Sequence, residues 1–301
     1  MMTELLSRGA HKQVESLERR LAAPVLVIGV GGMLHRAWAE ALRGRGAQVV
    51  APSMSELDLT DAAAIRRGLG DEYRLVVNCA AWTDVDGAEK NEEKATAINA
   101  TGVGELARRC AASGALLVHY STDYVFDGRA NAPYSVDAPR APLGAYGRSK
   151  ARGEELLAAS GAEHLSVRTS WLYAPWGKNF VRTIARLSRE RESLRVVDDQ
   201  RGRPTSAEHL VATSLALLAA GTRGTAHVTD GGECTWYELA CEVVRLTGAR
   251  CRVEPCTTAD YPTLAQRPAY SVLELRATER LVGAMPPWRQ ALAGVVARLE
   301  P

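Results

Sequence analysis

The sequence lacks the features that would place the protein on a membrane or on nucleic acid. Its net charge is only +2, which gives no electrostatic case for nucleic acid because such binding needs a clustered basic surface. No apolar run approaches the roughly 18 residues that span a bilayer. The first two dozen residues also lack the apolar segment and the small-residue cleavage site of a secretion signal. We therefore expect a cytoplasmic protein that binds neither nucleic acid nor membrane.

Cysteine motifs are missing as well. The six cysteines are scattered along the chain, with no CxxC pair and no His/Cys cluster, and Cys251 and Cys256 do not have the spacing of a zinc knuckle. Reduced and mostly buried thiols are typical of such a pattern in a cytoplasmic protein. We predict no metal site.

A complete dinucleotide fingerprint is also lacking. The stretch 24–36 reads PVLVIGVGGMLHR, an apolar run that breaks into Gly29, Gly31 and Gly32. The third glycine of GxxGxxG falls on His35, although that glycine serves close helix–strand packing rather than phosphate contact. Backbone amides at the start of a helix suit a pyrophosphate. Taken alone, this loop does not distinguish a cofactor site from a tight turn.

Alternation of apolar strands and helices is what the chain does contain. Short runs rich in Val, Leu and Ile predict strands, and the stretches between them predict helices. The strands are expected at 25–29, 47–51, 74–80, 115–121 and 164–170, and the helices at 33–43, 61–69, 92–113 and 146–160. Strands that are apolar on both faces and separated by helices indicate a parallel sheet covered on both sides. The fold class is therefore α/β, a doubly wound, Rossmann-like parallel sheet.

The rhythm loosens beyond residue 170, which predicts a second and smaller part. We expect residues 1–23 to be an N-terminal extension with a weak helical stripe, and 24–170 to be the dinucleotide-binding domain, with a return segment at about 200–222. Further helices are predicted at 206–220, 235–248 and 286–300. Residues 171–199 and 223–301 then form a smaller, discontinuous C-terminal lobe that binds substrate.

Three residues near the carboxyl ends of the predicted strands carry the chemistry. Tyr146 and Lys150 are four residues apart, which places them on one face of a helix. A nearby ammonium favours the phenolate and would move the tyrosine pKa from about 10 toward the working range. Thr122 ends a strand and would polarise a carbonyl. The three together have little purpose without a nicotinamide beside them, so we interpret the glycine loop as a working cofactor site. We expect His35 to shift the first helix slightly outward or to turn its ring toward solvent or phosphate.

At this point the sequence resembles a known family. The glycine loop, NCAAWTDVD (78–86), INATG (98–102), STDYVFDG (121–128) and the Tyr146/Lys150 pair are similar to the extended short-chain dehydrogenase/reductases. The narrower motifs RTSWLYAPWGKNF (168–180), DDQRGRPTSA (198–207) and RPAYSVLE (267–274) resemble the dTDP-4-dehydrorhamnose reductases. The resemblance runs from about residue 24 to the C-terminus.

The resemblance implies NAD(P)H-dependent reduction of a 4-keto sugar carried on dTDP. Tyr146 would donate a proton to the C4 oxygen, Lys150 would tune it and hold the ribose, and Thr122 would bind the carbonyl as charge develops. By the same resemblance the cofactor contacts are Gly29, Gly31, Gly32, Met33, Leu34, Ser53, Asp58, Leu59, Ala80, Ala81, Thr83, Asn99, Tyr146, Lys150 and Ser170. The substrate contacts are Thr122, Asp123, Val125, Phe126, Trp171, Asn179, Gln200 and Arg267. Trp171 offers a flat face for stacking on a deoxyhexose, and Arg267 suits a diphosphate.

Structural roles stay open for several of these residues. Asp58 has an alternative role near the start of the following helix, with Thr60 and Asp61. Asp199 and Gln200 have an alternative role in ordering their own loop, and Trp171 an alternative place in the core. Asn99 has either a structural or a proton-relay role.

Cofactor preference depends on the segment VVAPSMS (49–55). It holds no Asp or Glu that would bind the ribose 2′-hydroxyl and select NAD. A 2′-phosphate then has room near Ser53, with Arg36 as a second contact. We predict NADPH, with NADH use left open.

Rival functions are separated to different degrees. A dehydratase of the same superfamily would carry an Asp-Glu pair after the strand-end threonine, whereas Asp123 and Tyr124 follow Thr122 here. A sister ketoreductase of a secondary-metabolite sugar pathway remains a close alternative. A non-catalytic nucleotide-binding subunit is a weaker one, because it would not need the three catalytic residues together. A homodimer is compatible with the sequence, which does not fix the oligomeric state.

Overall fold

A six-stranded parallel sheet forms the centre of the molecule. The computed structural model describes residue 14 and residues 16–299. The strands lie in the order β10-β5-β4-β3-β1-β2 and every pairing is parallel. Their bounds are Val25–Ile28 (β1), Val49–Val50 (β2), Leu75–Asn78 (β3), Leu116–Thr122 (β4), His164–Thr169 (β5) and Gly224–His227 (β10). The predicted Rossmann-like fold and its five strands are confirmed.

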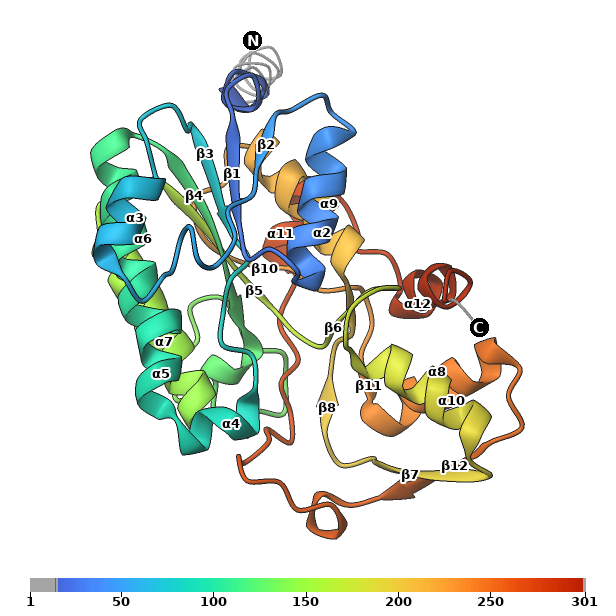
Figure 1. Cartoon of the computed structure of the whole chain (residues 1–301). Coiled ribbons are helices and arrows are strands. Elements are labelled where there is room, and N and C mark those ends of the chain that lie inside the picture. The colour runs from blue at the N-terminus through green and yellow to red at the C-terminus, as the bar shows by residue number, and fades with distance from the viewer. Residues whose placement is uncertain (1–13, 15, 300–301) are drawn as a thin grey trace.

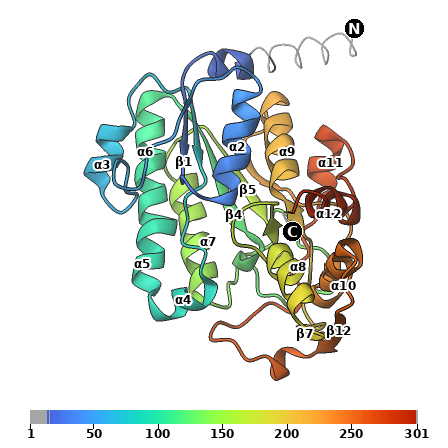
Figure 2. The same ribbon diagram turned by 45° about the vertical axis from the view of Figure 1, so that its right-hand side comes forward.

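Helices cover both faces of this sheet, as Figures 1 and 2 show. On one face, α2 (Met33–Arg43) and α9 (Ala207–Ala219) contribute to a core that includes the buried Trp38. On the other face, α3 (Ala62–Gly68), α6 (Val103–Ser113) and α7 (Ala145–Ala158) pack over a second core. The two-sided cover explains why the strands are apolar throughout.

The helix predicted over 92–113 is continuous but not uniform. It comprises α5 (Glu92–Thr96), a π-helical segment η1 (Ala97–Gly102) and then α6. The widened segment lies where α7 approaches most closely, since a Cβ at Gly153 would be 2.1 Å from the carbonyl oxygen of Asn99. Such π segments are frequent at functional sites.

A third hydrophobic core lies beside the sheet, toward the lower right of Figure 1. It is built from α8 (Phe180–Glu190), α10 (Trp236–Thr247), α12 (Trp288–Val296) and the parallel pair β7 (Ser193–Val197) and β12 (Arg252–Cys256). The helices predicted at 206–220, 235–248 and 286–300 are confirmed as α9, α10 and α12. The limits of a separate substrate lobe stay a prediction.

Short elements connect these parts. They are α4 (Val85–Lys90), η2 (Asp123–Val125), β6 (Leu172–Tyr173), β8 (Arg201–Gly202), β9 (Thr205–Ser206), β11 (Cys234–Thr235), η3 (Thr258–Asp260) and α11 (Arg276–Val282). The sequence predicted loops over much of 171–207, because two-residue strands leave no periodic signal.

The described end of the N-terminal extension packs on the fold. Residues 16–21 are helical, and Leu17 is buried in the core beside α2. Arg20 donates to the carbonyl oxygen of Arg74 at 3.0 Å and pairs with Glu163 at 2.5 Å. Residues 1–13 and 15 of the predicted extension lie outside the described residues. Over residue 14 and residues 16–299, no helix is both long and apolar enough to cross a membrane.

Candidate active site

A cavity of about 640 Å³ opens at the carboxyl ends of β1, β3, β4 and β5. Ligands of doubly wound sheets bind in this position. Its wall begins at the glycine loop, passes the ends of β3 and β4, and finishes at Trp171 and at Trp236 of α10. Elements from the sheet and from the third core therefore meet at one cavity.

The glycine loop brings backbone close to the strand beside it. Gly29 has φ +105°, and a Cβ there would lie 2.8 Å from the amide nitrogen of Ala80. Gly32 is the N-cap residue of α2 and no side chain caps this helix end. Gly29, Gly32, Met33 and Leu34 all line the cavity. The uncapped amides at this helix end suit a pyrophosphate, so the residues present fit a dinucleotide cofactor.

His35 lies away from this contact. Its side chain is buried on α2, and it is not among the cavity-lining residues. Burial lowers the pKa of its imidazole, so the ring is neutral at pH 7. The expectation that the ring turns toward solvent or phosphate is therefore wrong, because the ring is buried and lies outside the cavity wall.

Helix α7 carries the predicted acid–base pair. Tyr146 and Lys150 both line the cavity. Lys150 is only 2% exposed, and its Nζ donates to the carbonyl oxygen of Tyr120 at 2.5 Å. Burial lowers the pKa of Lys150 to about 8, partly offset by Glu154 one turn further along the helix. The lysine is thus a buried cation held by the backbone of β4.

Two buried polar residues that the sequence did not point to lie behind Lys150. The Nε2 atom of His119 in β4 lies 3.5 Å from Lys150 Nζ, and its Nδ1 atom lies 3.2 Å from the side-chain nitrogen Nδ2 of Asn78. Burial, with the charge of Lys150, keeps the pKa of His119 well below its usual range. The parallel register of β3 and β4 sets Asn78 directly beside His119. The neutral His119 and the Tyr120 carbonyl oxygen are therefore the groups within hydrogen-bond distance of the lysine, while the carboxylate of Glu154 acts on it through its charge.

Tyr146 differs from the expectation in its pKa. Burial raises the pKa of this phenol to about 12, and a hydrogen bond with Thr122 only partly offsets it. Because desolvation opposes the phenolate, the Lys150 ammonium does not bring the pKa toward neutrality in this arrangement. Tyr146 is protonated at neutral pH.

Thr122 connects Tyr146 to Asp123. The Thr122 hydroxyl donates to Asp123 Oδ1 at 2.9 Å and accepts the backbone amide of Tyr124 at 3.2 Å. Asp123 is buried, its Oδ2 atom has no hydrogen-bond partner, and burial raises its pKa to about 6. Both residues line the cavity. Asp123 thus keeps one buried carboxylate oxygen without a partner at this end of the cavity.

Fewer than half of the other predicted contacts also reach this cavity. Asp58, Leu59, Ala80, Ala81, Thr83, Ser170 and Trp171 line it, whereas Gly31, Ser53, Asn99, Val125, Phe126, Asn179, Gln200 and Arg267 do not. Asp58 also accepts the amide and the hydroxyl of Thr60 at 2.8 Å, and Asp61 caps α3. The local role of Asp58 near the start of α3 is therefore confirmed, whereas its contact with a cofactor stays a prediction.

Ser53 has its donors engaged elsewhere. Its amide and its hydroxyl each donate to the carboxylate of Glu56 at 2.7 Å. Arg36 lies over the ring of Trp176 at 4.3 Å and pairs with Glu40. The suggested partnership of Ser53 and Arg36 around a 2′-phosphate is therefore not assembled, because Glu56 binds Ser53 and Glu40 pairs with Arg36.

Asn99 has a structural position in η1. Its amide accepts the backbone amide of Trp82 at 2.9 Å and donates to Ser149 Oγ at 3.0 Å. Ser149 in turn donates to the carbonyl oxygen of Tyr146. Asn99 thereby fixes α7, and with it the catalytic pair, to the loop at Trp82.

Val125 and Phe126 are buried away from the cavity. Both belong to a small hydrophobic cluster, and Phe126 stacks on Tyr134 with the ring centres 4.4 Å apart. Gln200 donates to Thr258, and Asp199 accepts from the same threonine. The loop-ordering alternative for Asp199 and Gln200 therefore describes their contacts.

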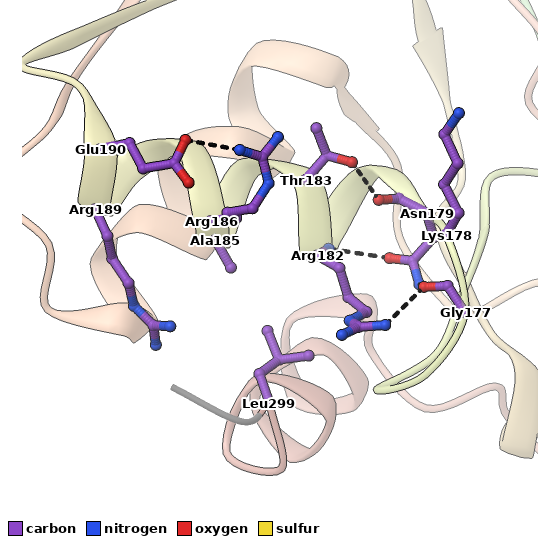
Figure 3. Close-up of a pocket in the computed structure, with 10 residues that line it drawn as sticks. All are labelled: Gly177, Lys178, Asn179, Arg182, Thr183, Ala185, Arg186, Arg189, Glu190 and Leu299. Atoms are coloured by element: carbon purple, nitrogen blue, oxygen red, sulfur yellow. Dashed lines mark hydrogen bonds and ion pairs between the residues drawn. The ribbon is translucent and has the colours of Figure 1, made fainter.

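Asn179 caps α8. Its carbonyl oxygen accepts the amide of Arg182 at 3.0 Å and its amide donates to the carbonyl oxygen of Ala174 at 2.9 Å. Figure 3 shows this cap in a separate pocket of about 450 Å³ along α8, lined by Arg182, Arg186 and Arg189 among others. The polar atoms of the Asn179 side chain are thus already hydrogen-bonded within the fold.

Arg267 retains a free donor. One nitrogen pairs with Asp86 at 2.7 Å, while the buried Nη1 has no hydrogen-bond partner. A guanidinium with one unused buried donor suits an anionic ligand.

Trp171 has a strained backbone. Among the described residues it is the one non-glycine residue with a positive φ, at +47°. Such a conformation costs about 1–3 kcal/mol and clusters at functional sites. Its indole stacks on that of Trp236, with ring centres 3.7 Å apart and an interplanar angle of 12°. Sequence reasoning missed Trp236, since it begins a helix more than sixty residues away.

Comparison with known proteins agrees with this geometry. Residues 23–300 match the family model described as the RmlD substrate binding domain. The chain belongs to this family. A family member from Streptomyces griseus, a dTDP-4-dehydrorhamnose reductase, is 43% identical over 281 residues, covering 89% of this chain and 91% of the relative. The resemblance inferred from the motifs is confirmed.

Two further relatives bear on the range of reactions in the family. A dTDP-4-keto-6-deoxy-D-glucose reductase from Streptomyces niveus is 43% identical over 252 residues, covering 82% of this chain and 87% of the relative. The crystal structure of a dTDP-4-dehydrorhamnose reductase from Bacillus anthracis in complex with NADP has a TM-score of 0.88 at 34% identity, covering 91% of this chain and 99% of that one. The Streptomyces griseus and Streptomyces niveus reductases, which are named for two different dTDP-keto sugars, are therefore both 43% identical to this chain.

Proposed function

We propose that the protein is an oxidoreductase that uses NADPH to reduce the 4-keto group of a dTDP-4-dehydro-6-deoxy sugar. The observation that carries the proposal is the convergence of Tyr146, Lys150 and Thr122 on the cavity that begins at the glycine loop. dTDP-4-dehydro-L-rhamnose is the substrate we favour, because the relative in complex with NADP is a dTDP-4-dehydrorhamnose reductase. The proposal places the reaction in the cytoplasm.

The cofactor would lie along the first half of the cavity. The Gly29–Leu34 backbone would hold the pyrophosphate, and Asp58 and Leu59 would flank the adenosine, since these residues line the wall there. When bound, the nicotinamide supplies the hydride that reduces C4. Lys150, buried beside Tyr146, would hold the nicotinamide ribose.

The chain's own groups supply the proton and the charge stabilisation. As hydride reaches C4, negative charge develops on the carbonyl oxygen. Thr122 would then turn its single hydroxyl proton from Asp123 Oδ1 to this oxygen, a hydrogen bond worth about 3 kcal/mol where comparable donors have been removed. The Tyr146 phenol transfers its proton to the same oxygen, giving the alcohol and a phenolate that solvent reprotonates. The cation of Lys150 stabilises that phenolate while it lasts.

The substrate diphosphate would lie near Arg267, whose Nη1 has no partner. We propose that the third core and its connecting segments act as the substrate lobe, at residues 171–199 and 223–301. Four predicted contacts outside the cavity wall have polar atoms bonded within the fold, and we assign them structural roles: Ser53, Asn99, Asn179 and Gln200.

Turnover with defined sugars tests the proposal. Wild-type protein is expected to oxidise NADPH in the presence of dTDP-4-dehydro-L-rhamnose, with the product identified by NMR as dTDP-L-rhamnose. Tyr146→Phe, which retains the ring, is expected to lose about 10²–10⁴-fold in rate. Equal NADPH consumption by both proteins would refute the catalytic assignment.

A sister ketoreductase is the second candidate. It is favoured by the 43% identity to the Streptomyces niveus dTDP-4-keto-6-deoxy-D-glucose reductase. Turnover of the 6-deoxy-D-glucose ketone, with none of the L-rhamnose ketone, would select this alternative and would leave the roles of Tyr146, Lys150 and Thr122 unchanged.

A further inference from the structure

Trp171 is covered on both faces of its indole. One face stacks on Trp236, with the ring centres 3.7 Å apart. On the other side, a Cβ added at Gly202 would lie 2.6 Å from Cε2, 2.7 Å from Cζ2 and 2.9 Å from Nε1 of the same indole. Because the ring-fusion atom Cε2 is the nearest of the three, the Gly202 backbone lies over the ring and not at its edge. We call this arrangement of Gly202, Trp171 and Trp236 the indole sandwich.

Both outer layers of the sandwich are themselves fixed. Trp236 is the first residue of α10, where Thr235 and Glu238 form a reciprocal capping box. Its ring also contacts Phe180 of α8, with centres 4.6 Å apart. Gly202 is paired in β8 with Cys234 of β11. The sandwich therefore joins the end of β5 to the third core.

The sandwich changes what Trp171 can offer a sugar. Trp171 and Trp236 both line the cavity, but Trp236 covers one face of the Trp171 indole and Gly202 approaches the other face over Cε2, Cζ2 and Nε1, which leaves little room for stacking on a hexose ring. The part of Trp171 that meets a ligand is the ring edge. An indole edge is electropositive whereas its face is electronegative, so an edge prefers a sugar oxygen to the apolar face of a sugar.

We propose that Trp236 and Gly202 are positioning residues that hold Trp171 edge-on to the sugar and thereby set its affinity and the choice between keto-sugar epimers. This inference rests on the proposed function, because it assigns the sugar end of that same cavity. The strained φ of +47° at Trp171 is consistent with a residue held by its neighbours and not by its own backbone preference.

Two substitutions remove the sandwich from opposite sides. Trp236→Leu removes the stacking partner, and Gly202→Ala inserts a methyl group where the indole lies. Gly202 does not have a positive φ, so alanine there adds no backbone strain. The matched controls are Trp288→Phe, a core tryptophan of α12, and Gly294→Ala, where an added Cβ would meet nothing within 4 Å.

The first readout is binding measured by calorimetry. Both sandwich variants are expected to bind dTDP-L-rhamnose about 2- to 10-fold more weakly than wild type, the range expected for loss of an aromatic pair. Their affinities for dTDP and NADPH are expected to be unchanged, and Trp236→Phe is expected to restore most of the sugar affinity. The ratio of kcat/KM for dTDP-4-dehydro-L-rhamnose over dTDP-4-keto-6-deoxy-D-glucose is expected to move toward one in both variants but not in the controls.

The second readout is the circular dichroism couplet produced by two stacked indoles. It is expected in wild type with and without dTDP-L-rhamnose, and to be absent in Trp236→Leu. Loss of the couplet when the sugar binds to wild type would show that Trp171 leaves the sandwich to stack, and would overturn the proposal. Unchanged sugar affinity in both variants would overturn it too. Failure of wild type to bind either dTDP or dTDP-L-rhamnose would instead refute the proposed function.

Discussion

Replacement of Lys150 by methionine gives a quantitative test of how the site is built. Lys150 is 2% exposed, and burial lowers its pKa from 10.5 to about 8. At about 1.4 kcal/mol for each pH unit, the buried charge costs the folded state roughly 3 kcal/mol. Methionine has a similar shape and no charge, so it removes this cost. It also leaves the carbonyl oxygen of Tyr120 without its donor, a loss of about 1–3 kcal/mol.

The pH dependence separates these two contributions. The folded pKa lies below the unfolded one, so the cost of the charge is fully present below about pH 8. Between pH 8 and 10.5 the unfolded chain binds more protons than the folded one, so wild-type stability gains from this group as the pH rises. The lost hydrogen bond does not depend on pH. Relative to wild type, Lys150→Met is therefore expected to lose roughly 3 kcal/mol between about pH 7 and the unfolded pKa.

Urea unfolding of both proteins across this pH range is the assay. Other titrating groups are shared by the two proteins and cancel in the difference. Replacing the exposed Lys94 by methionine is the control, and its difference from wild type is expected to stay constant. A constant difference for Lys150→Met as well would refute the reasoning, since it would mean that the buried ammonium carries no desolvation cost. Catalysis in Lys150→Met is expected to be lost at every pH.

Three further predictions concern the proton donor's neighbour, the cofactor loop and the buried ion pair on α7. Thr122→Val keeps the shape of the side chain and is expected to lower kcat by about 10²–10³-fold with an unchanged KM for NADPH. Steady-state kinetics that show a changed KM and an unchanged kcat would contradict the role of Thr122 in charge stabilisation. Glu56→Gln keeps an acceptor for Ser53 but removes a negative charge from the loop after β2. It is expected to raise the ratio of kcat/KM for NADPH over NADH by about two- to fivefold, the effect of an exposed charge pair. An unchanged ratio would place Glu56 outside the cofactor site. Arg168 is 5% exposed and bonded to Glu154 at 2.7 Å, and Glu154→Gln leaves it without this charged partner. The variant is expected to lower the free energy of unfolding in urea by about 3–5 kcal/mol. Glu155→Gln, at the exposed neighbouring position, is expected to cost less than about 1 kcal/mol.

Local rules account for the part of the site that the sequence predicted. The spacing of Tyr146 and Lys150 is a property of one helix, and Thr122 ends one strand, so periodicity alone placed them. The glycine loop likewise depends on residues that are close in sequence. Each of these features is decided within a single element or at its end, and the parallel sheet then brings the ends together.

The residues that the sequence missed are fixed by contacts between elements. His119 and Asn78 meet through the register of β3 and β4. Trp236 meets Trp171 through the packing of α10 against the end of β5. Neither contact leaves a periodic trace in the chain. The same reason explains Phe126, which lies four residues beyond Thr122 and yet packs in a separate hydrophobic cluster.

The direction of the reaction gives the raised pKa of Tyr146 a chemical meaning. The sequence led us to expect Lys150 to draw this pKa toward neutrality, whereas burial raises it to about 12. An acid that reduces a ketone must hold its proton until the alkoxide forms, and a phenol with this pKa remains protonated at pH 7. The alkoxide that hydride transfer creates is a much stronger base than the phenolate, so proton transfer from Tyr146 is still downhill. Because the ammonium of Lys150 donates to the carbonyl oxygen of Tyr120, its charge stays near Tyr146 without ionising the phenol before hydride transfer. The raised pKa of Tyr146 thus suits its role as the acid in ketone reduction.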